Sequence, residues 1–391
     1  MTVGPAHPRI LLTNFHPQRD GGGGHMRHVW TLISSPLARE FDFGVAAPEG
    51  SAVLAAGRAH RLPTFACDFP GKITEAWGVL RAVRRFQRIH REWEPDLINV
   101  NGSRDQQIVA FWKQLYRRRV PCVRSHLAIR CIPDNAYNRW SYNRMMQGNI
   151  YICHTAKNIS WAGGHLRPAR SRVIPNGVDL DFWRPMAKDA SYLAKLDISP
   201  SDFVFGSHAG MAPHKRTDLF LRASALALRR GARAFKVLLR GRQPEIEWSR
   251  SLATELGLTN VVYLLHEPDP RGYLSVVDVG FVLSETIEAL SYAARELMAM
   301  GKPLLSSNYA GLVENVDDGL NGRLVECGDV EGVAEAIRWF LDQSPEQFER
   351  LRRHARQKAE LVFDVRRQVE GTARFYRDVL EKCRVPSAEC R

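Results

Sequence analysis

Glu288 and Glu296 stand eight residues apart in the segment SETIEALSYAARELMAM, a spacing that could bring two carboxylates to one ligand. Eight residues make a little over two helical turns, so both side chains can lie on one face of a helix. If Glu288 precedes a short helix, the backbone amides of Ala289, Leu290 and Ser291 are free to hold a phosphate. Taken alone, the pair also fits an ordinary loop glutamate followed by an exposed helix glutamate.

A basic pair follows the apolar run FVFGSHA, in the loop GMAPHKRTD. Lys215 and Arg216 stand just before a helix that we expect to begin near Thr217. Cations in a loop that follows a strand are well placed to meet a diphosphate. A solvated surface lysine fits the same loop, so both interpretations stay open.

Two further candidates follow apolar runs in the first half of the chain. His126 ends the run PCVRSHL, where a histidine serves either as a structural hydrogen-bonding group or in catalysis. Gly22 and Gly23 belong to DGGGGHMRH, and glycine amides there could approach a ligand beside a helix beginning near His25. A turn that only needs positive φ would use the same glycines.

The elements that must position these residues alternate between strands and helices. In the first half, the apolar runs are RILLTNF, FDFGVAAP, DLINVN, PCVRSHL and NIYICHTA; in the second half, they are FVFGSHA, FKVLLRG, VVYLL, VGFVLS and PLLSS. Such alternation predicts parallel sheets covered by helices on both faces. The fold class is therefore α/β, with two Rossmann-like domains.

The segment VIPNGVDLDFWRP lies between the halves, and its prolines and glycine interrupt any regular element. We take it as the hinge, with a first domain at 1–183 and a second at 184–369. A C-terminal helix at 370–391 is expected to pack back on the first domain. Ligands of such sheets sit beyond the carboxyl ends of the strands, so we expect the site in a cleft between the domains.

Composition narrows the class of protein. The 391 residues are 45% hydrophobic and 25% charged, which is typical of a folded globular chain. No apolar run approaches the roughly 20 residues that span a bilayer, and the start has no basic region typical of a signal peptide, so we expect a cytoplasmic protein. The seven cysteines include no CxxC pair, which argues against a disulfide framework and a zinc site.

Positive charge is concentrated in the first half. Residues 1–185 carry 26 Lys and Arg against 13 Asp and Glu, whereas residues 186–391 carry 29 of each kind. This asymmetry predicts an anionic partner for the first half, such as membrane headgroups, an acidic acceptor or nucleic acid. Within it, residues 75–92 form a basic amphipathic helix, whose arginines are either simply solvated or dock on the anionic inner face of a membrane.

Together these motifs resemble glycosyltransferase family 4 over nearly the whole chain. They follow the family order: the Gly-rich loop, His126, IPNGVD, GMAPHKR, the E-x7-E pair and KPLLSSNYAGLVENVDDGLNGRLVECGD. The resemblance implies the GT-B fold, in which two Rossmann-like domains face an interdomain cleft. It also implies retaining transfer of a hexose-type sugar from a UDP- or GDP-sugar to a glycan or lipid-linked acceptor, in cell-surface polysaccharide or lipopolysaccharide synthesis.

The resemblance assigns roles to the candidate residues. Glu296 would hydrogen-bond the ribose hydroxyls of the nucleotide, and Glu288 would contact the transferred sugar. Lys215 would neutralise the diphosphate, and His126 would lie beside the sugar, while the Gly-rich loop lets the first domain close on the donor. The leaving phosphate would help to deprotonate the acceptor, so electrostatic stabilisation of that phosphate is the main contribution of the protein.

The sequence departs from the family pattern in two places. No arginine precedes Lys215 in GSHAGMAPHK, so Arg216 or Arg240 would take its place at the diphosphate. Ala-Leu-Ser follows Glu288 where Gly-Phe-Gly is usual, which leaves the donor sugar open. Asp179-Leu-Asp181 superficially matches a metal-binding DxD, but it belongs to the hinge motif, so we expect no metal and no cofactor beyond the donor.

Other functions fit parts of the same sequence. A basic nucleic-acid-binding protein would suit the charge, but no recognition motif appears and the charge is spread over a sheet domain, so no nucleic-acid partner is expected. A sugar-nucleotide epimerase on the same fold and an inactive, partner-binding relative stay open. A glycogen-type phosphorylase lacks support, because the sequence has no lysine motif for pyridoxal phosphate.

Overall fold

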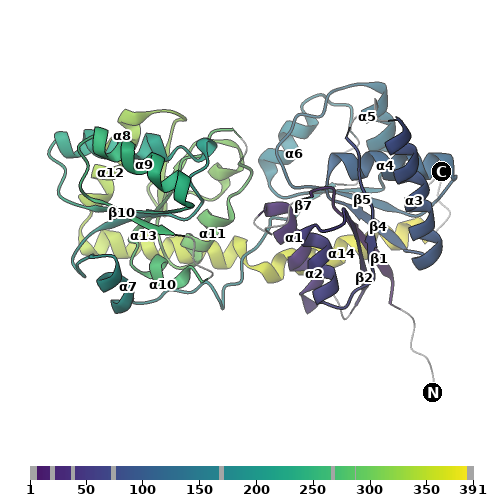
Figure 1. Ribbon diagram of the computed structural model, residues 1–391, viewed down its shortest axis with the longest axis horizontal. Helices are drawn as coiled ribbons and strands as arrows, with labels where there is room; N and C mark the ends of the chain where they lie inside the picture. Colours follow the sequence, from purple (N-terminus) through teal and green to yellow (C-terminus); the bar gives the residue numbers. More distant parts are fainter. Residues whose placement is uncertain are drawn as a thin grey trace, which may run out of the picture. The chain divides into compact units, whose positions relative to one another are not determined.

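The computed structural model describes residues 7–17, 23–36, 40–71, 76–166, 171–265, 269–286 and 288–384. The chain divides into two compact domains, the first formed by Met1–Asn176 with Arg366–Arg391 and the second by Gly177–Val365. In each domain, helices cover both faces of a sheet (Figure 1). All strand pairs between the named strands are parallel, so the prediction of two Rossmann-like α/β domains is confirmed.

The sheet of the first domain has the strand order β3-β2-β1-β4-β5-β6-β7. Its strands are β1 (Arg9–Thr13), β2 (Asp42–Ala47), β3 (Thr64–Ala66), β4 (Leu97–Val100), β5 (Cys122–His126), β6 (Gly148–Tyr151) and β7 (Ser171–Val173). Its helices are α1 (Gly24–Ile33), α2 (Ala52–Ala59), α3 (Ala76–Trp93), α4 (Ser103–Leu115), α5 (Ala136–Trp140), η2 (Ser141–Met145), α6 (His154–Trp161) and α14 (Val365–Arg384). The central strands are buried along nearly their whole length, as strands covered on both faces should be.

The sheet of the second domain has the strand order β10-β9-β8-β11-β12-β13. Its strands are β8 (Val204–Ser207), β9 (Lys236–Gly241), β10 (Val261–Leu265), β11 (Val279–Val282), β12 (Leu304–Ser307) and β13 (Gly322–Val325). Its helices are α7 (Ala190–Lys195), η4 (Pro213–Lys215), α8 (Thr217–Arg229), α9 (Gln243–Glu255), α10 (Arg271–Ser275), α11 (Tyr292–Ala299), η5 (Ala310–Glu314), α12 (Val330–Leu341), α13 (Pro345–Lys358) and η6 (Ala359–Phe363).

Two apolar cores hold the second domain together, one on each face of its sheet. The helices α8, α9 and α12 cover one face, where the ring of Phe220 stacks on that of Phe281 with centroids 3.8 Å apart. On the opposite face, α10 and α11 pack with η6 (Figure 1). The two cores fix the sheet, so the loops that follow its strands start from defined positions.

The boundary between the domains lies earlier than 183/184, the position expected from the sequence. Val178 donates its amide hydrogen to the Phe363 carbonyl oxygen at 2.7 Å, and the Val365 amide donates to the Val178 carbonyl oxygen at 3.1 Å. Leu180 and Trp183 are buried in a core of the second domain. The segment after Asn176 is therefore built into the second domain by this backbone pairing.

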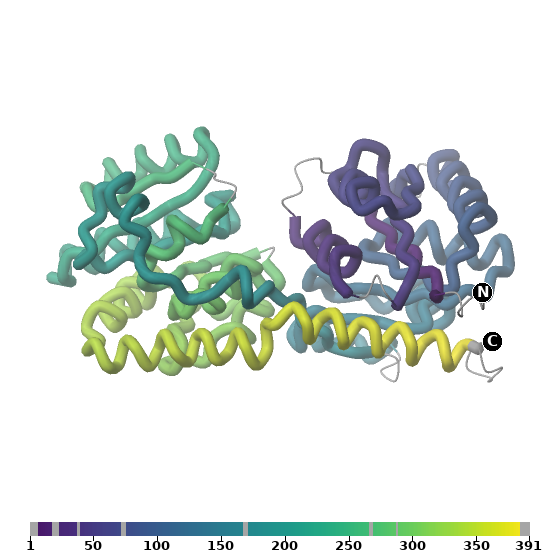
Figure 2. The backbone as a smooth tube through the Cα atoms, turned by 90° about the horizontal axis from the view of Figure 1, so that it is seen from below, coloured from purple at the N-terminus to yellow at the C-terminus, as the bar shows by residue number. Residues whose placement is uncertain are grey.

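The C-terminal helix α14 packs on the first domain, although it begins at Val365 rather than at residue 370. Phe375 fills the space above Gly148 of β6, and the ring of Tyr376 meets that of Phe41 edge to face at 5.9 Å. Figure 2 shows this yellow helix running along the first domain. Among the described residues, no helix is both long and apolar enough to cross a membrane.

Candidate active site

Two candidate residues from different loops meet in the second domain. Lys215 ends η4 after β8, and Glu288 follows β11, the neighbour of β8 in the sheet. The Lys215 ammonium contacts Glu288 Oε2, and the Ser284 hydroxyl donates to the same oxygen at 3.2 Å. Because parallel strands end at one edge of the sheet, their loops bring a cation and a carboxylate together.

Glu296 lies on α11 and is nearly inaccessible, with 2% of its side chain exposed. Its Oε2 lies 2.7 Å from Nε2 of His208, the first residue after β8, and His208 Nδ1 lies 3.3 Å from the Tyr273 hydroxyl. Sequence reasoning missed His208, although it stands in the same loop as Lys215. The only signal was its position directly after a strand.

The helix after Glu288 starts later than the spacing argument assumed. Its first residue is Tyr292, and the Ser291 hydroxyl caps it by accepting from the Ala294 amide at 3.4 Å. Ser291 has φ +56°, outside the range of a right-handed helix, so the helix cannot extend upstream. Glu288 therefore lies in a loop, and the expectation that it shares a helix face with Glu296 was wrong.

A buried arginine is linked to this loop through the side chain of Asn315. Arg295, which is 1% exposed, donates from Nε to the Asn315 side-chain oxygen at 3.0 Å. The Asn315 amide donates in turn to the Leu290 carbonyl oxygen at 2.6 Å, and the Arg295 guanidinium lies 4.3 Å from the centroid of the Phe363 ring. Sequence reasoning missed Arg295 and Asn315 as residues that position the loop.

The structure places Arg216 directly beside Lys215 but against carboxylates. Its guanidinium contacts Glu285 and donates to the Asp218 carboxylate at 3.0 and 3.1 Å. These hydrogen bonds, to Asp218 first and Glu285 second, raise the pKa of Arg216. Its charge is thus shared with two acidic groups. Arg240, the other arginine considered, is the penultimate residue of β9, next to β8 in the sheet.

His126 ends β5 in the first domain and is buried. Its Nε2 lies 3.1 Å from the Asn149 side-chain oxygen, and its ring stacks on Tyr151 with centroids 4.1 Å apart. Burial, and secondarily the charge of Arg124, lower the pKa of His126 to about 3. At neutral pH, His126 is therefore an uncharged hydrogen-bonding group.

Gly22 lies outside the described residues, whereas Gly23 is the residue before α1. Gly23 has φ −86°, so a requirement for positive φ does not explain this glycine. Its carbonyl oxygen accepts from the Met26 and Arg27 amides, which starts the helix. Further along α1, His28 Nδ1 lies 2.9 Å from the Asn176 side-chain oxygen at the end of the first segment of this domain.

The DxD-like pair belongs to a turn. Asp179 accepts from the amides of Asp181 and Phe182 at 2.9 and 3.1 Å, which caps the chain reversal there. No group of three or more His, Cys, Asp or Glu side chains able to hold a metal ion occurs within the described ranges.

Two family models match the chain in succession. Residues 22–182 match the model "Glycosyltransferase Family 4", and residues 190–358 match "Glycosyl transferases group 1". The two matches cover the body of each domain, and they confirm the resemblance inferred from the motifs.

Individual relatives agree with the models. The D-inositol 3-phosphate glycosyltransferase of Nocardia farcinica is 32% identical over 177 residues, which are 43% of this chain and 39% of that protein. A glycogen synthase of Mycobacterium tuberculosis is 25% identical over 409 aligned positions, covering 94% of both chains. Among solved structures, Anabaena Alr3699/HepE in complex with UDP and glucose superposes with a TM-score of 0.76 at 20% identity, covering 95% of this chain and 100% of that one. This chain belongs to glycosyltransferase family 4, the retaining, nucleotide-sugar-dependent enzymes of the GT-B fold.

Proposed function

We propose that the enzyme transfers a hexose-type sugar, with retention, from a UDP- or GDP-sugar to a glycan or lipid-linked acceptor in cell-surface polysaccharide or lipopolysaccharide synthesis. The observation that carries the proposal is the contact between Lys215 and Glu288 at the sheet edge where Glu296 is held by His208. The UDP and glucose bound by the Anabaena neighbour support the choice of donor class.

In this proposal, Lys215 binds the diphosphate of the donor, and Glu288 contacts the sugar that is transferred. The bond between the sugar C1 and the phosphate oxygen breaks, and a bond from C1 to the acceptor oxygen forms on the same face. The acceptor proton passes to the leaving phosphate. Lys215 stabilises the negative charge that grows on this phosphate, and the low exposure of its side chain, 17%, strengthens that attraction.

Glu296 has the role of a nucleotide ligand rather than an acid or base. Ribose hydroxyls can donate hydrogen bonds to a carboxylate, and His208 Nε2 lies 2.7 Å from one oxygen of the Glu296 carboxylate. The loop from Glu288 to Ser291, anchored by Asn315, then lies beside the sugar.

Donor binding and hydrolysis test the proposal. A panel of UDP- and GDP-sugars is added to the wild-type enzyme and to Glu296→Ala, with melting temperature and sugar release as readouts. At least one nucleotide sugar is expected to raise the melting temperature of the wild type and to lose most of this effect in the variant. Failure of every nucleotide sugar to stabilise the wild type would overturn the proposal.

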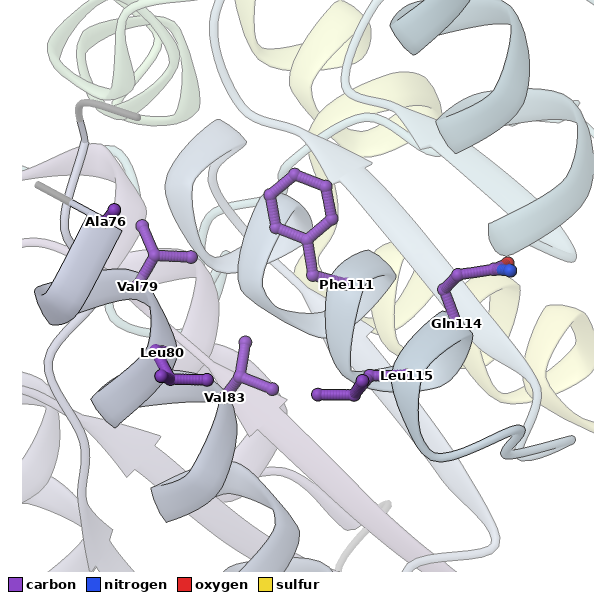
Figure 3. A pocket seen from close by; sticks show the side chains of 7 residues that line it. All are labelled: Ala76, Val79, Leu80, Val83, Phe111, Gln114 and Leu115. Atoms are coloured by element: carbon purple, nitrogen blue, oxygen red, sulfur yellow. The ribbon is translucent and has the colours of Figure 1, made fainter. Parts of the chain in front are cut away.

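The proposal includes peripheral attachment to the anionic inner face of a membrane. A hollow of about 390 Å³ opens between α3 and α4, lined by Ala76, Val79, Leu80, Val83, Phe111, Gln114 and Leu115 (Figure 3). Leu115, which lines the hollow, is 60% exposed, and Trp77 in the first turn of α3 is 78% exposed. The four arginines at positions 81, 84, 88 and 91 form an exposed stripe along α3. Apolar side chains beside a row of cations suit an anionic lipid surface.

The apolar side chains on the inner face of α3 are buried. Val83, Phe86 and Ile89 are buried in the core of the first domain, as the solvated-helix interpretation requires. Trp77 is not, so membrane docking is assigned to the start of α3. Sedimentation with phosphatidylglycerol vesicles tests it: Trp77→Ser and Arg84→Gln should each lower binding at least threefold, whereas Arg229→Gln in the second domain should not. Equal binding to phosphatidylcholine vesicles would contradict this assignment.

A further inference from the structure

Buried polar atoms without partners gather in the first domain at the carboxyl ends of β1, β4 and β5. Within the described ranges, six such atoms have no hydrogen-bond partner: Asn14 Nδ2, His16 Nε2, His25 Nδ1, Asn101 Oδ1, Asp105 Oδ1 and Arg124 Nε. Buried polar groups in proteins are nearly always satisfied, so each of these atoms calls for a partner that the folded chain does not supply.

The residues form one connected cluster. The Asn101 amide donates to Asp105 Oδ2 at 2.8 Å, and the His16 amide donates to the Asn14 side-chain oxygen at 2.9 Å. The rings of His16 and His25 are 4.4 Å apart, and His25 also hydrogen-bonds the Asn101 backbone. Contacts thus run from the loop after β1 to the start of α4.

Arg124 completes the cluster from β5. Its Nη1 donates to the Val100 carbonyl oxygen at 3.4 Å, and its side chain is only 8% exposed. Its charge acts on both Asp105 and His25. The Nε of this buried guanidinium is a donor for which the folded chain supplies no acceptor.

The unpartnered atoms are chemically mixed. Asn14 and Arg124 offer donors, Asn101 and Asp105 offer acceptors, and the two imidazole nitrogens can serve either way. Hydroxyl groups both donate and accept, so a hydroxyl-rich ligand matches the set better than a purely anionic one.

The surrounding charge is positive. Arg104 and Arg130 act on His16 and Arg124 acts on His25, and after burial these charges lower the pKa of both histidines. Asp105 is the acidic group that the cluster itself contains, and burial raises its pKa although Arg124 lowers it. Three guanidiniums beside one acidic group suit a phosphate ester, which is negatively charged at neutral pH as a monoester or as a diester.

We propose that this cluster binds the acceptor, and that the acceptor is a sugar or cyclitol carrying a phosphate group. Its hydroxyls form hydrogen bonds with Asn14, Asn101 and Asp105. Its phosphate binds the guanidiniums of Arg124, Arg104 and Arg130. The inference rests on the proposed function, because it names the class of molecule whose hydroxyl receives the transferred sugar.

Calorimetric titration of the full-length enzyme tests the acceptor class. UDP or GDP, whichever binds the enzyme more tightly, is kept saturating, so that the diphosphate site is occupied. The ligands are glucose 6-phosphate, mannose 6-phosphate and myo-inositol 1-phosphate, their neutral parents, inorganic phosphate, and the three sugar or cyclitol phosphates as decyl phosphodiesters. At least one phosphorylated compound is expected to bind tenfold more tightly than both its parent and inorganic phosphate. Preference for the free monoester identifies a free acceptor, and preference for the decyl ester a lipid-linked one.

Variants locate the site. Arg104→Gln and Arg130→Gln change exposed side chains and are each expected to weaken the tightest ligand at least fivefold. Arg119→Gln, an exposed arginine of the same domain, should change the affinity less than twofold. The proposal is overturned if no phosphorylated compound outbinds its parent, or if all three variants bind alike. A donor titration without acceptor separates the two failures: loss of nucleotide-sugar binding would count against the proposed function itself.

Discussion

His208 Nε2 lies 2.7 Å from Glu296 Oε2, and the two side chains are only 8% and 2% exposed. The pair ties the loop after β8 to α11 in the interior of the second domain. This contact limits the directions from which the Glu296 carboxylate oxygens can accept hydrogen bonds from a ligand. The relationship links the residue that sequence reasoning placed at the ribose to one that it overlooked.

Replacing His208 should disturb donor binding through Glu296. His208→Phe removes the imidazole partner of the carboxylate, and we expect nucleotide-sugar affinity to fall about tenfold. Tyr273→Phe removes only the hydroxyl on the far side of the ring and should cost less than threefold. Calorimetric titration measures both. Equal losses in the two variants would contradict a specific role for the contact between His208 and Glu296.

Replacing Asn315 should shift the loop from Glu288 to Ser291 and so lower the turnover rate. Asn315→Ala takes a hydrogen-bond partner from buried Arg295 and frees the Leu290 carbonyl, so we expect a loss of about 2 kcal/mol in unfolding free energy. Urea denaturation measures this loss, and kcat should fall more than donor KM rises. Ser251→Ala, at an exposed side chain on α9 of the same domain, is the control and should leave kcat unchanged.

Acid should destabilise the first domain through His126. Its pKa in the folded protein, about 3, lies below its ordinary value of 6.5. Below pH 6.5 the unfolded chain therefore takes up a proton that the folded protein does not, and stability falls as pH drops towards 3. Between pH 7 and 5 this group alone should cost about 2 kcal/mol. His126→Asn should show a correspondingly shallower pH dependence in urea denaturation.

Gly177 should tolerate no side chain. A Cβ there would lie 2.4 Å from the Val365 Cα and 2.5 Å from its nitrogen, both backbone atoms. Gly177→Ala should therefore cost at least about 2 kcal/mol of unfolding free energy, because the Val178–Val365 pairing must shift. In α14, Gly371→Ala meets only side-chain atoms, at 3.2 Å or more, and should be neutral or stabilising. Similar losses in both variants would contradict this account of the domain boundary.

Much of the fold could be predicted because its signals are local. Each apolar run rich in β-branched residues became a strand, as VVYLL did in β10, and the basic amphipathic segment at 75–92 became α3. The short strands β3, β7 and β13 escaped prediction. Sequences such as SRV and GRLV are too short and too charged to carry a pattern, and pairing with a neighbouring strand defines them.

The site was predictable only in part. Lys215 and Glu288 stood in recognisable loops after strands, and the sheet order brings them together. Ser291 caps the helix in a conformation with positive φ, which a serine in the sequence does not predict. The start of the helix was therefore misplaced. Arg295 looked like an ordinary helix arginine, because its burial arises from Asn315 and Phe363, which are distant in sequence.

The central claim is that Lys215 and Glu296 bind the two ends of the nucleotide in one donor site. Calorimetric titration of the preferred nucleotide sugar, its free nucleoside diphosphate and its nucleoside into wild type, Lys215→Met, Glu296→Gln and the exposed control Lys195→Met tests it most directly. Lys215→Met should weaken both diphosphates at least tenfold and leave the nucleoside unchanged, whereas Glu296→Gln should weaken all three. Unchanged affinities in Lys215→Met and Glu296→Gln, or no binding of any nucleotide sugar to the wild type, would contradict the account.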